Sequence, residues 1–488
     1  MNARVIIRVN AGIALALGVA LLVPLLLSLG YGDGSWESFL LPAMVLVPIG
    51  ILGFLATRPA SGRAVRYVSN RDVLFSVTLA WILAALLGGI PYLIEGTFSN
   101  PIDSTFEAMS GFTTTGASLL SEIEAQTPSI LFWRSLTQWL GGIGIVVLFV
   151  AVAPVLGFGA ARLLSAEVSG IEQPRLTPRI TDTAKALLSV YLALSLAQTV
   201  ALLLAGMSLY DAVVHTFTTI ATGGFSPKNA SVGFYDSVAI EIILIVFMIL
   251  AGVSFALYYL LYTRRRWNVL ADRELLTYLG ILVGAVLFVW GVLVVEGNYG
   301  DSWAQAFRDA AFSVVSITTT TGYVTADFDL WESGAKYALV LLMFIGGCAG
   351  STAGGIKVIR VIVIFKTILA DLLRSVHPKA IAPLKVGERV LSEQTRVAIL
   401  GLFAAWMLVF GVGTFLLTIQ PDLTLVSSAT AVAATLNVIG PGLEQVGASE
   451  SYEAVNLFGR VVLTFCMLLG RLEILTALVL LTPTFWKW

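Results

Sequence analysis

The sequence has little charge, cysteine or histidine. Charged residues make up 12% of its 488 residues, whereas about a quarter is usual in soluble proteins, so too little polar surface is available to keep the chain in water. Lys plus Arg number 29 and Asp plus Glu 30, and this near-zero balance gives no support for nucleic-acid binding. Two cysteines, Cys348 and Cys466, and two histidines are too widely spaced for a zinc, redox or disulfide framework. With 57% hydrophobic residues, the chain is predicted to be an integral membrane protein.

Long apolar runs predict the membrane spans. A span needs about 20 mostly apolar residues. Runs of this kind lie at 9–29, 39–57, 73–94, 131–157, 186–206, 238–262, 275–295, 336–365, 397–419 and 456–482. The first run follows Arg4 and Arg8, but it is longer than the apolar region of about 7–15 residues in a signal peptide. We therefore expect a retained helix there and ten spans in all.

The loops between these runs alternate in charge. Loops 58–71, 264–273 and 357–396 are rich in Lys and Arg. Four loops on the other side carry acidic residues, namely Asp33 and Glu37; Glu95, Asp103 and Glu107; Asp327, Asp329 and Glu332; and Glu444, Glu450 and Glu453. Cytoplasmic loops carry the excess of basic residues, so the basic loops and both termini are predicted to be cytoplasmic. The alternative, that loop charge is only solvated surface, does not predict so regular an alternation.

Four short semi-polar stretches interrupt the last eight spans, one between the members of each pair. Each ends in small or hydroxyl residues and a glycine. Their cores are Thr113, Thr114, Thr115 and Gly116; Ile220, Ala221, Thr222 and Gly223; Thr319, Thr320, Thr321 and Gly322; and Asn437, Val438, Ile439 and Gly440. The glycines are 107, 99 and 118 residues apart, which predicts a fourfold internal repeat of helix, re-entrant segment and helix.

Three repeats share an acidic residue ahead of the glycine. Asp103, Asp211 and Asp309 stand 13, 12 and 13 residues before their glycines, as suits the first turn of a re-entrant helix. Ser104 with Glu107, and Ser208 with Asp211, have the spacing of capping boxes. The fourth repeat departs from this pattern, because its nearest acidic residue lies 18 residues before Gly440.

The composition of the four stretches indicates a monovalent cation site. Non-helical backbone at membrane depth must be buried in protein or line a watery path. Glycine allows the unusual backbone angles that turn carbonyls toward one axis, and threonine adds uncharged oxygens. Such oxygens favour potassium, whereas a divalent ion more often recruits carboxylates, which the stretches lack. A single T-x-G is ordinarily a packing contact between helices, but four in register favour a K+ selectivity filter.

Several longer motifs resemble the TrkH/KtrB family of K+ transporters, within the Trk/Ktr/HKT superfamily, and the resemblance covers essentially the whole chain. They are the stretch from Trp133 to Gly142, Asn437 to Gly442, Gly346 to Lys357, and Gly470 to Glu473. The resemblance implies an all-α polytopic membrane protein with four pseudo-symmetric M1–pore helix–filter–M2 repeats around a central pore. The two additional N-terminal spans are similar to the extra domain of the TrkH-like subgroup.

These repeats predict five units along the chain. They are an N-terminal two-helix domain (1–72) and repeats at 73–160, 161–272, 273–392 and 393–488. The family resemblance further implies a homodimer in the cytoplasmic (inner) membrane, in which each subunit has its own pore. It also implies a cytosolic TrkA-like nucleotide-binding subunit that regulates the pore, and no organic cofactor.

A glycine-rich stretch below the third filter segment is a candidate gate. Five glycines in residues 346–355 interrupt what would otherwise be one long helix, and each costs about 1 kcal/mol relative to alanine in a helix, so a loop is predicted. The family resemblance makes this loop an intramembrane gate. Its candidate residues are Gly346, Gly347, Gly350, Ser351, Thr352, Gly354, Gly355 and Lys357. The alternative is a small-residue packing face of GxxxG type.

Arg471 is the second candidate gating residue. It falls near the middle of the last apolar run, where an ionisable residue normally faces a cavity or a partner. Glu473 lies on another side of the same helix and is a poor partner for it. Arg471 is therefore predicted either to face the pore as a fixed positive charge or to form a structural ion pair with another helix.

Three functional classes follow from these features. The first is a channel-like K+ uptake protein, and the second an ion-coupled (H+ or Na+) symporter with alternating access, which would usually carry a buried carboxylate at its site. A membrane enzyme is the third and is disfavoured, because the sequence has no nucleophile–base cluster, Walker motif or metal constellation.

Overall fold

The computed structural model describes residues 1–58, 69–152, 180–264, 270–297, 299–378, 384–386 and 389–487. Parts of the predicted cytoplasmic loops, at 59–68, 265–269 and 379–383, lie outside these residues, and so does the predicted boundary between the first two repeats at 160.

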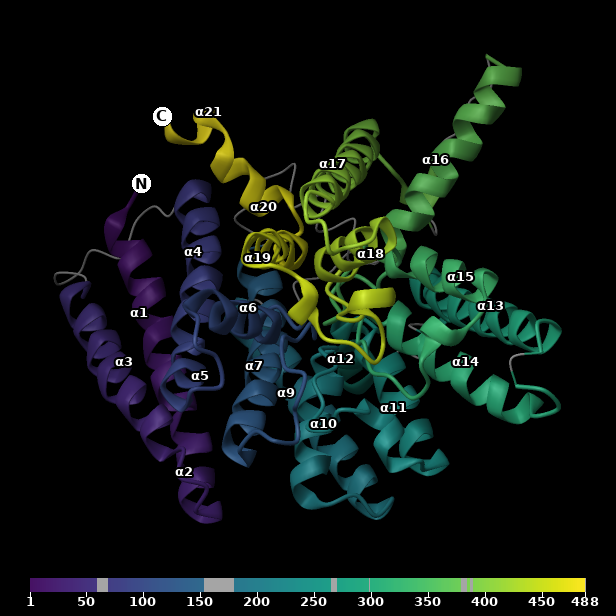
Figure 1. Cartoon of the computed structure of the whole chain (residues 1–488). Helices are drawn as coiled ribbons and strands as arrows, with labels where there is room; N and C mark the ends of the chain where they lie inside the picture. The colour runs from purple at the N-terminus through teal and green to yellow at the C-terminus, as the bar shows by residue number, and fades with distance from the viewer. Residues whose placement is uncertain are drawn as a thin grey trace.

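The fold is helical, and the same order of elements recurs four times after an N-terminal unit (Figure 1). The N-terminal unit contains α1 (Ala3–Ala20), α2 (Leu22–Tyr31) and α3 (Trp36–Ala56). The first two repeats contain α4 (Asn70–Gly88), α5 (Ile90–Glu95), α6 (Pro101–Phe112) and α7 (Pro128–Val152), then α9 (Ile180–Leu204), α10 (Leu209–Ile220), α11 (Val238–Ala251) and α12 (Phe255–Arg264). The last two contain α13 (Arg273–Val295), α14 (Trp303–Thr318), α15 (Ser333–Met343) and α16 (Val358–Val376), then α17 (Glu393–Leu417), α18 (Leu425–Leu436), α19 (Leu457–Arg471) and α20 (Leu475–Leu478).

Shorter elements complete the described part of the chain. They are the hairpin β1 (Lys385–Val386) and β2 (Arg389–Val390), the C-terminal α21 (Pro483–Trp486), and the 3-10 turns Ser231–Tyr235, Phe328–Leu330, Glu444–Val446, Tyr452–Ala454 and Val479–Leu481. Both termini lie at the same side of the molecule, together with the free end of α16 (Figure 1).

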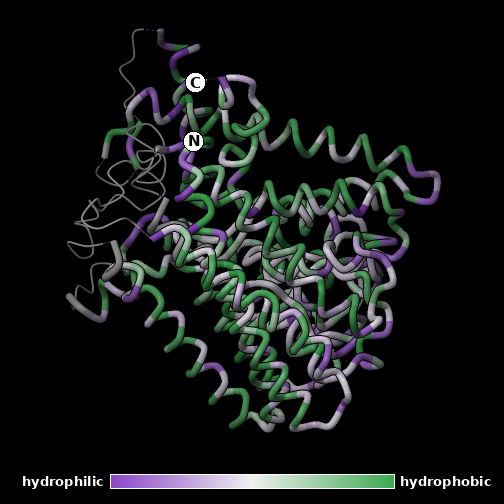
Figure 2. Tube along the Cα trace, turned by 90° about the vertical axis from the view of Figure 1, so that its left-hand side faces the viewer, coloured by the Kyte–Doolittle hydropathy of each residue, from purple (hydrophilic) through white to green (hydrophobic). Residues whose placement is uncertain are grey.

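Many large hydrophobic side chains are exposed on the outer surfaces of the long helices. Six helical segments of the described chain are long and apolar enough to cross a membrane, and two further pairs are bent by 90° and 111°. Hydrophobic residues run along these helices, and polar ones gather toward the loops (Figure 2). Because water would not tolerate so much exposed apolar surface, the chain is an integral membrane protein, as its composition predicts.

Three of the predicted spans are broken into separate segments, whereas the α1–α2 and α4–α5 spans have only a one-residue interruption. The break between α15 and α16 is the glycine-rich stretch, as predicted from its composition. Two further breaks were not predicted: α11 turns by 90° into α12 after Gly252, and α19 turns by 111° into α20 at Glu473. Glu473 and Ile474 both have positive φ, 54° and 55°, which ends the helix because L-residues cannot continue it in that conformation.

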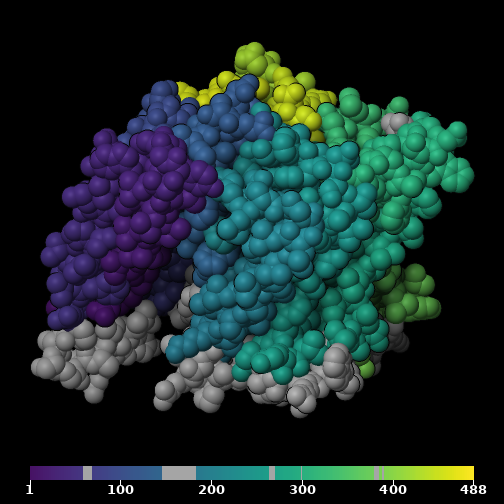
Figure 3. Space-filling model, turned by 90° about the horizontal axis from the view of Figure 1, so that it is seen from below, coloured from purple at the N-terminus to yellow at the C-terminus, as the bar shows by residue number. Residues whose placement is uncertain are grey.

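The N-terminal helices form one edge of the molecule (Figure 3). α1 and α3 pack through small residues, because a Cβ at Gly50 or Gly53 would lie under 3.0 Å from atoms of Leu15 or Ala11. Membrane helices commonly approach through such residues, since lipid supplies no hydrophobic drive between helices.

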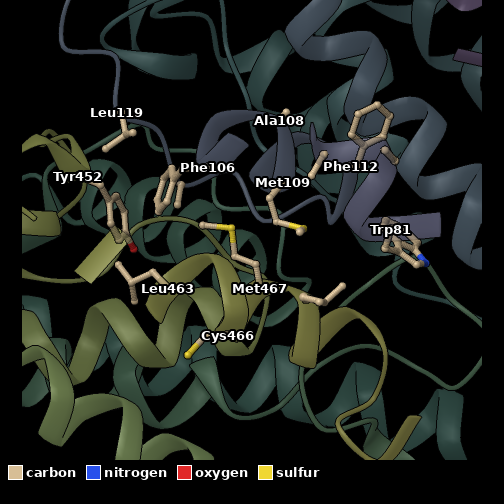
Figure 4. Packing of buried hydrophobic residues seen from close by; sticks show 14 of the residues in the cluster. Trp81, Phe106, Ala108, Met109, Phe112, Leu119, Tyr452, Leu463, Cys466 and Met467 are labelled. Atoms are coloured by element: carbon tan, nitrogen blue, oxygen red, sulfur yellow. The ribbon is translucent and has the colours of Figure 1, made fainter. Parts of the chain in front are cut away.

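The first and fourth repeats pack directly against each other. Phe106 and Met109 of α6 face Met467 of α19 and Tyr452 in a buried cluster (Figure 4), and the Phe106 and Tyr452 rings are 5.9 Å apart. Contact between the first and last repeats closes the repeats into a ring.

The short helices begin partly as predicted. Ser208 caps α10, its hydroxyl accepting from the Asp211 amide at 3.1 Å. The predicted cap at Ser104 is wrong, because α6 starts earlier with Asn100 as its N-cap. Asp309 is likewise not in a first turn, since α14 begins at Trp303.

Candidate ion pathway

Four non-helical strips follow the C-terminal ends of α6, α10, α14 and α18. In each strip one backbone amide donates to a carbonyl five residues earlier. These bonds are Thr115 to Ser110 (2.8 Å), Gly223 to Thr218 (2.7 Å), Thr321 to Ser316 (2.9 Å) and Ile439 to Ala434 (2.8 Å). The residue before each donor has φ between 54° and 62°, namely Thr114, Thr222, Thr320 and Val438. The four strips therefore share one backbone conformation and one register.

This register differs by one residue from the sequence prediction in the second strip. Gly224, not Gly223, is equivalent to Gly116, Gly322 and Gly440, and all four have positive φ. Ile220 is the last residue of α10 rather than part of the strip proper. Because Gly223 and Gly224 are adjacent, the sequence allowed either of them to be aligned with the other glycines. The distance from the preceding aspartate favours Gly224, since Asp211 lies 13 residues before it, as in the first and third repeats.

The four strips surround one axis in the order of the repeats. A Cβ added to each equivalent glycine would lie under 3.0 Å from a carbonyl oxygen of the next strip. The contacts are Gly116 to Gly223, Gly224 to Thr321, Gly322 to Ile439, and Gly440 to Thr115. Each strip thus needs glycine for its positive φ and for the close approach of its neighbour. The contacts form a closed ring that brings the four carbonyls to one level.

Side chains behind the strips hold three of them in place. The Thr113 and Thr115 hydroxyls are 2.8 Å apart, and so are those of Thr319 and Thr321. In the fourth strip, the Asn437 side chain accepts from the Trp406 indole at 3.1 Å and donates to Ala433. All of these side chains are buried, so their hydrogen bonds are not exchanged with water and help to fix the backbone.

A buried ion pair beside the first strip was missed by the sequence analysis. Arg134 of α7 contacts Glu107 of α6 at 2.6 Å, with 3% and 0% of the side chains exposed. Glu107 also accepts from Ser118 and from the Leu119 amide, and Arg134 donates to the Ser226 carbonyl at 3.2 Å. The pair ties the outer end of the first strip to that of the second. Because Glu107 lies three residues after Ser104, the sequence predicts a capping box for it, and Glu107 was therefore not considered as an ion-pair partner of Arg134.

The glycine-rich loop lies directly beneath the strips. The Gly354 amide donates to Thr320 Oγ1 at 2.6 Å, and Thr352 Oγ1 donates to the Ile220 carbonyl at 3.0 Å. A Cβ at Gly354 would lie under 3.0 Å from Asn437 O and Val438 Cβ. The loop therefore contacts the end of α10 and the inner ends of the third and fourth strips.

Backbone hydrogen bonds connect this loop to the break in the second repeat. The Cys348 amide donates to Gly252 O at 2.8 Å, and the Phe255 amide donates to Gly350 O at 3.1 Å. Buried Glu274 of α13 accepts from the amides of Ala349 (2.7 Å) and Ile359. The carboxylate thus takes the place of helix hydrogen bonds that the loop cannot make.

The other predicted gate residues help to shape the loop. Gly350 and Gly355 have φ of 75° and 65°, so they adopt a conformation that L-residues rarely take. Gly346 and Gly347 each leave no room for a Cβ. Ser351 Oγ donates to the Cys348 carbonyl at 2.6 Å, and the Lys357 ammonium donates to the Ala353 carbonyl.

Arg471 joins the loop to the first repeat. Its guanidinium donates to Thr352 O at 2.9 Å and to Gly141 O at 3.2 Å, and its residue is 3% exposed. It forms no salt bridge with a carboxylate in the part of the chain that the structure describes. Glu473 instead pairs with Arg360 of α16 at 2.5 Å. The alternative of a structural ion pair between Arg471 and another helix is therefore not observed among the described residues, and the guanidinium lies beneath the strips.

Comparison with known proteins identifies the family. The family model described as "TrkH: Cation transport protein" matches residues 66–487. The chain belongs to the TrkH family of cation transport proteins. The Trk system potassium uptake proteins TrkH of Halomonas elongata and of Vibrio parahaemolyticus are 38% and 40% identical to it, each over 100% of both chains.

The fold of a solved TrkH is also similar. The crystal structure of the potassium transporter TrkH from Vibrio parahaemolyticus matches with a TM-score of 0.91 at 38% identity, covering 100% of both chains. The all-α polytopic fold predicted from the sequence is thereby confirmed.

Replacing the first equivalent glycine should alter ion discrimination. In Gly116→Ser, the added Cβ would press on Gly223 O. We expect the K+/Na+ permeability ratio to fall about tenfold, the factor for ~1.4 kcal/mol of relative ion binding. Reversal potentials of purified protein in planar bilayers would measure it.

Gly96→Ser is the matched control. Gly96 has nearly the same φ, 82° against 84°, but no atom lies within 4 Å of an added Cβ. It should reproduce the backbone strain and leave selectivity unchanged. Equal permeability ratios in both folded variants would contradict the placement of Gly116 in a filter.

Proposed function

We propose that this chain mediates passive, channel-like K+ uptake through the ring of four strips. The observation that carries the proposal is the closed set of contacts from Gly116, Gly224, Gly322 and Gly440 to the carbonyls of neighbouring strips. Four carbonyls held at one level can replace the hydration shell of a monovalent cation.

The donor set fits K+ as the transported ion. The strips offer backbone carbonyls and threonine hydroxyls and contain no carboxylate. The Thr114 hydroxyl is buried and has no hydrogen-bond partner among the described residues, so it is available as a ligand. Uncharged oxygens suit a weakly hydrated monovalent ion better than Ca2+ or Mg2+.

The loop from Gly346 to Gly355 acts as the gate in this proposal. Its contacts with Ile220, Thr320 and Asn437 support a position across the inner end of the filter. Lys357 and Arg471 bring positive charge to the same level and would repel a permeating cation. To open, the loop must leave these contacts. Its backbone hydrogen bonds to the α11–α12 break would couple a movement of α12 to a movement of the loop.

The protein is proposed to lie in the cytoplasmic (inner) membrane with both termini in the cytoplasm. The basic loops support this orientation, and so does the position of both termini on one side (Figure 1). We infer a cytosolic TrkA-like nucleotide-binding partner, because the curated relatives are named as parts of a Trk system. A homodimer is proposed through α16, whose free end projects from the rest of the molecule (Figure 1) and exposes Phe365, Leu369 and Val376 by 62%, 51% and 72%.

Reversal potentials in asymmetric ion gradients test passive flux against ion coupling. Passive flux predicts a reversal potential that follows the K+ gradient and does not move when a pH or Na+ gradient is imposed, apart from the small Na+ permeability. A symporter would shift its reversal with the gradient of the coupled ion, and that result would replace channel-like uptake with ion-coupled transport.

Removing the Arg471 side chain should open the gate. Arg471→Ala loses two charge-assisted hydrogen bonds, to Thr352 and Gly141, and one such bond contributes about 1.5–3 kcal/mol. We expect K+ flux per folded molecule to rise about tenfold or more, the factor for ~1.4 kcal/mol or more in the closed–open equilibrium. Flux into liposomes without any partner protein is the measurement.

Arg460→Ala is the comparison variant for Arg471. Arg460 lies on the same helix, α19, and pairs with Asp103 at 2.7 Å at the opposite end. Its removal should lower the thermal stability in detergent without raising flux. If Arg471→Ala behaves in the same way, Arg471 holds helices together and does not keep the gate closed.

A further inference from the structure

The second strip lacks the side chains that brace the first and third. Where those strips carry threonine pairs with hydroxyls 2.8 Å apart, the second carries Ala221 and Gly223 at the equivalent positions. Two adjacent glycines, Gly223 and Gly224, also make it the strip with the greatest intrinsic backbone freedom. Something outside the strip must hold it in the shared conformation.

Gln138 of α7 occupies the vacant position. Its side-chain amide donates to Gly223 O at 2.7 Å and accepts from the Phe225 amide at 3.1 Å. Its residue is 0% exposed, so water does not compete for either bond. The Gln138 amide thus forms a hydrogen bond to the strip on each side of Gly224, as donor to Gly223 O and as acceptor from the Phe225 amide.

The glycine at 223 is explained by this side chain. Gly223 is not among the residues with positive φ, so its backbone conformation does not require glycine. A Cβ there would instead lie under 3.0 Å from three atoms of the Gln138 amide. Gln138 therefore fills the space that a threonine side chain takes in the first and third strips.

The helix that carries Gln138 is itself fixed against the second strip. Arg134, one turn earlier, donates to Ser226 O and stacks 3.7 Å from the centre of the Phe225 ring. One turn later, a Cβ at Gly142 would lie 3.0 Å from Ala221 Cβ. Gln138 thus lies between two close contacts of α7 with the same strip, and the amide position is determined by rigid elements.

We propose that Gln138 is a positioning residue for ion selectivity, which replaces the missing threonine pair and fixes the direction of the Gly223 carbonyl. This role rests on the proposed function, since it assumes that the Gly223 carbonyl is an ion ligand. Without this hydrogen bond, the Gly223 carbonyl oxygen could move closer to the axis and coordinate the smaller Na+ ion. Loss of the Gln138 amide should therefore favour Na+ relative to K+.

The first test removes the amide. Gln138→Ala should lower the K+/Na+ permeability ratio about fivefold, the factor that corresponds to one ordinary hydrogen bond, while K+ flux per folded molecule persists. Gln138→Glu keeps the shape but loses the donor to Gly223 O, and it should lower the ratio as well. Gln198→Ala is the control, because it removes a buried glutamine of α9 whose amide has no hydrogen-bond partner among the described residues.

The second test uses the reciprocal fit of Gln138 and Gly223. Gly223→Ser alone should impair selectivity and folded yield, because its side chain would overlap the Gln138 amide. In the Gln138→Ala background the same serine has room and supplies a hydroxyl, so the double variant should be more K+-selective than either single variant. If the two substitutions acted independently, their effects on the K+/Na+ permeability ratio would add, and the double variant would be less K+-selective than either single variant.

The outcomes separate this role from the proposed function. A selective wild type with unchanged ratios in both Gln138 variants would overturn the role of Gln138 alone. Additive defects in the double variant would overturn it too. A wild type that does not prefer K+ over Na+ would overturn the proposed function, and the role of Gln138 with it.

Discussion

The structure depends on one constraint: carbonyl groups at membrane depth need partners, and an unpaired one costs several kcal/mol in lipid. The four strips leave helical geometry where water is scarce, and their equivalent glycines place each strip against a carbonyl of its neighbour. Other contacts hold the strips in this arrangement. They are the short helices before the strips, the buried Glu107–Arg134 pair and the hydrogen bonds between the paired threonine hydroxyls.

The same constraint explains why three helices break beneath the ring. Each break frees backbone groups. Those of the second and third repeats bind one another, because Gly252 O accepts from the Cys348 amide and Gly350 O accepts from the Phe255 amide, while the Arg471 side chain at the end of α19 donates to Thr352 O of the loop. The first repeat differs, because α7 continues as a helix past Gly141 and offers a carbonyl to Arg471 instead. Fourfold similarity in the strips is thus combined with asymmetry below them, where the glycine-rich loop of the third repeat contacts the inner ends of the third and fourth strips.

Much of this could be predicted from the sequence, because repeats, glycines and apolar runs are local signals. The glycine-rich loop follows from helix propensity alone. The register of the second strip was predicted one residue off, since Thr222-Gly223-Gly224 allows two alignments; the spacing from Asp211 favours Gly224, and the tertiary contacts with Gly116 and Thr321 agree with it. The partners of Arg471 and Glu107 are 119 and 27 residues away, and one sequence holds no signal for which distant backbone or side chain a charge will meet. The bends at Gly252 and Glu473 lie inside long, mostly apolar runs, whose length and hydrophobicity alone predict one continuous helix.

The central claim is that the four carbonyls contributed by Thr115, Gly223, Thr321 and Ile439 bind the transported ion. Diffraction from crystals grown with Tl+ or Rb+ in place of K+ would test it directly, because both scatter anomalously and resemble K+ in size. The account predicts anomalous peaks on the axis at the level of these carbonyls, which diminish when Na+ replaces the heavier ion. Anomalous density found only outside the ring, or none at the strips at saturating Tl+, would contradict it.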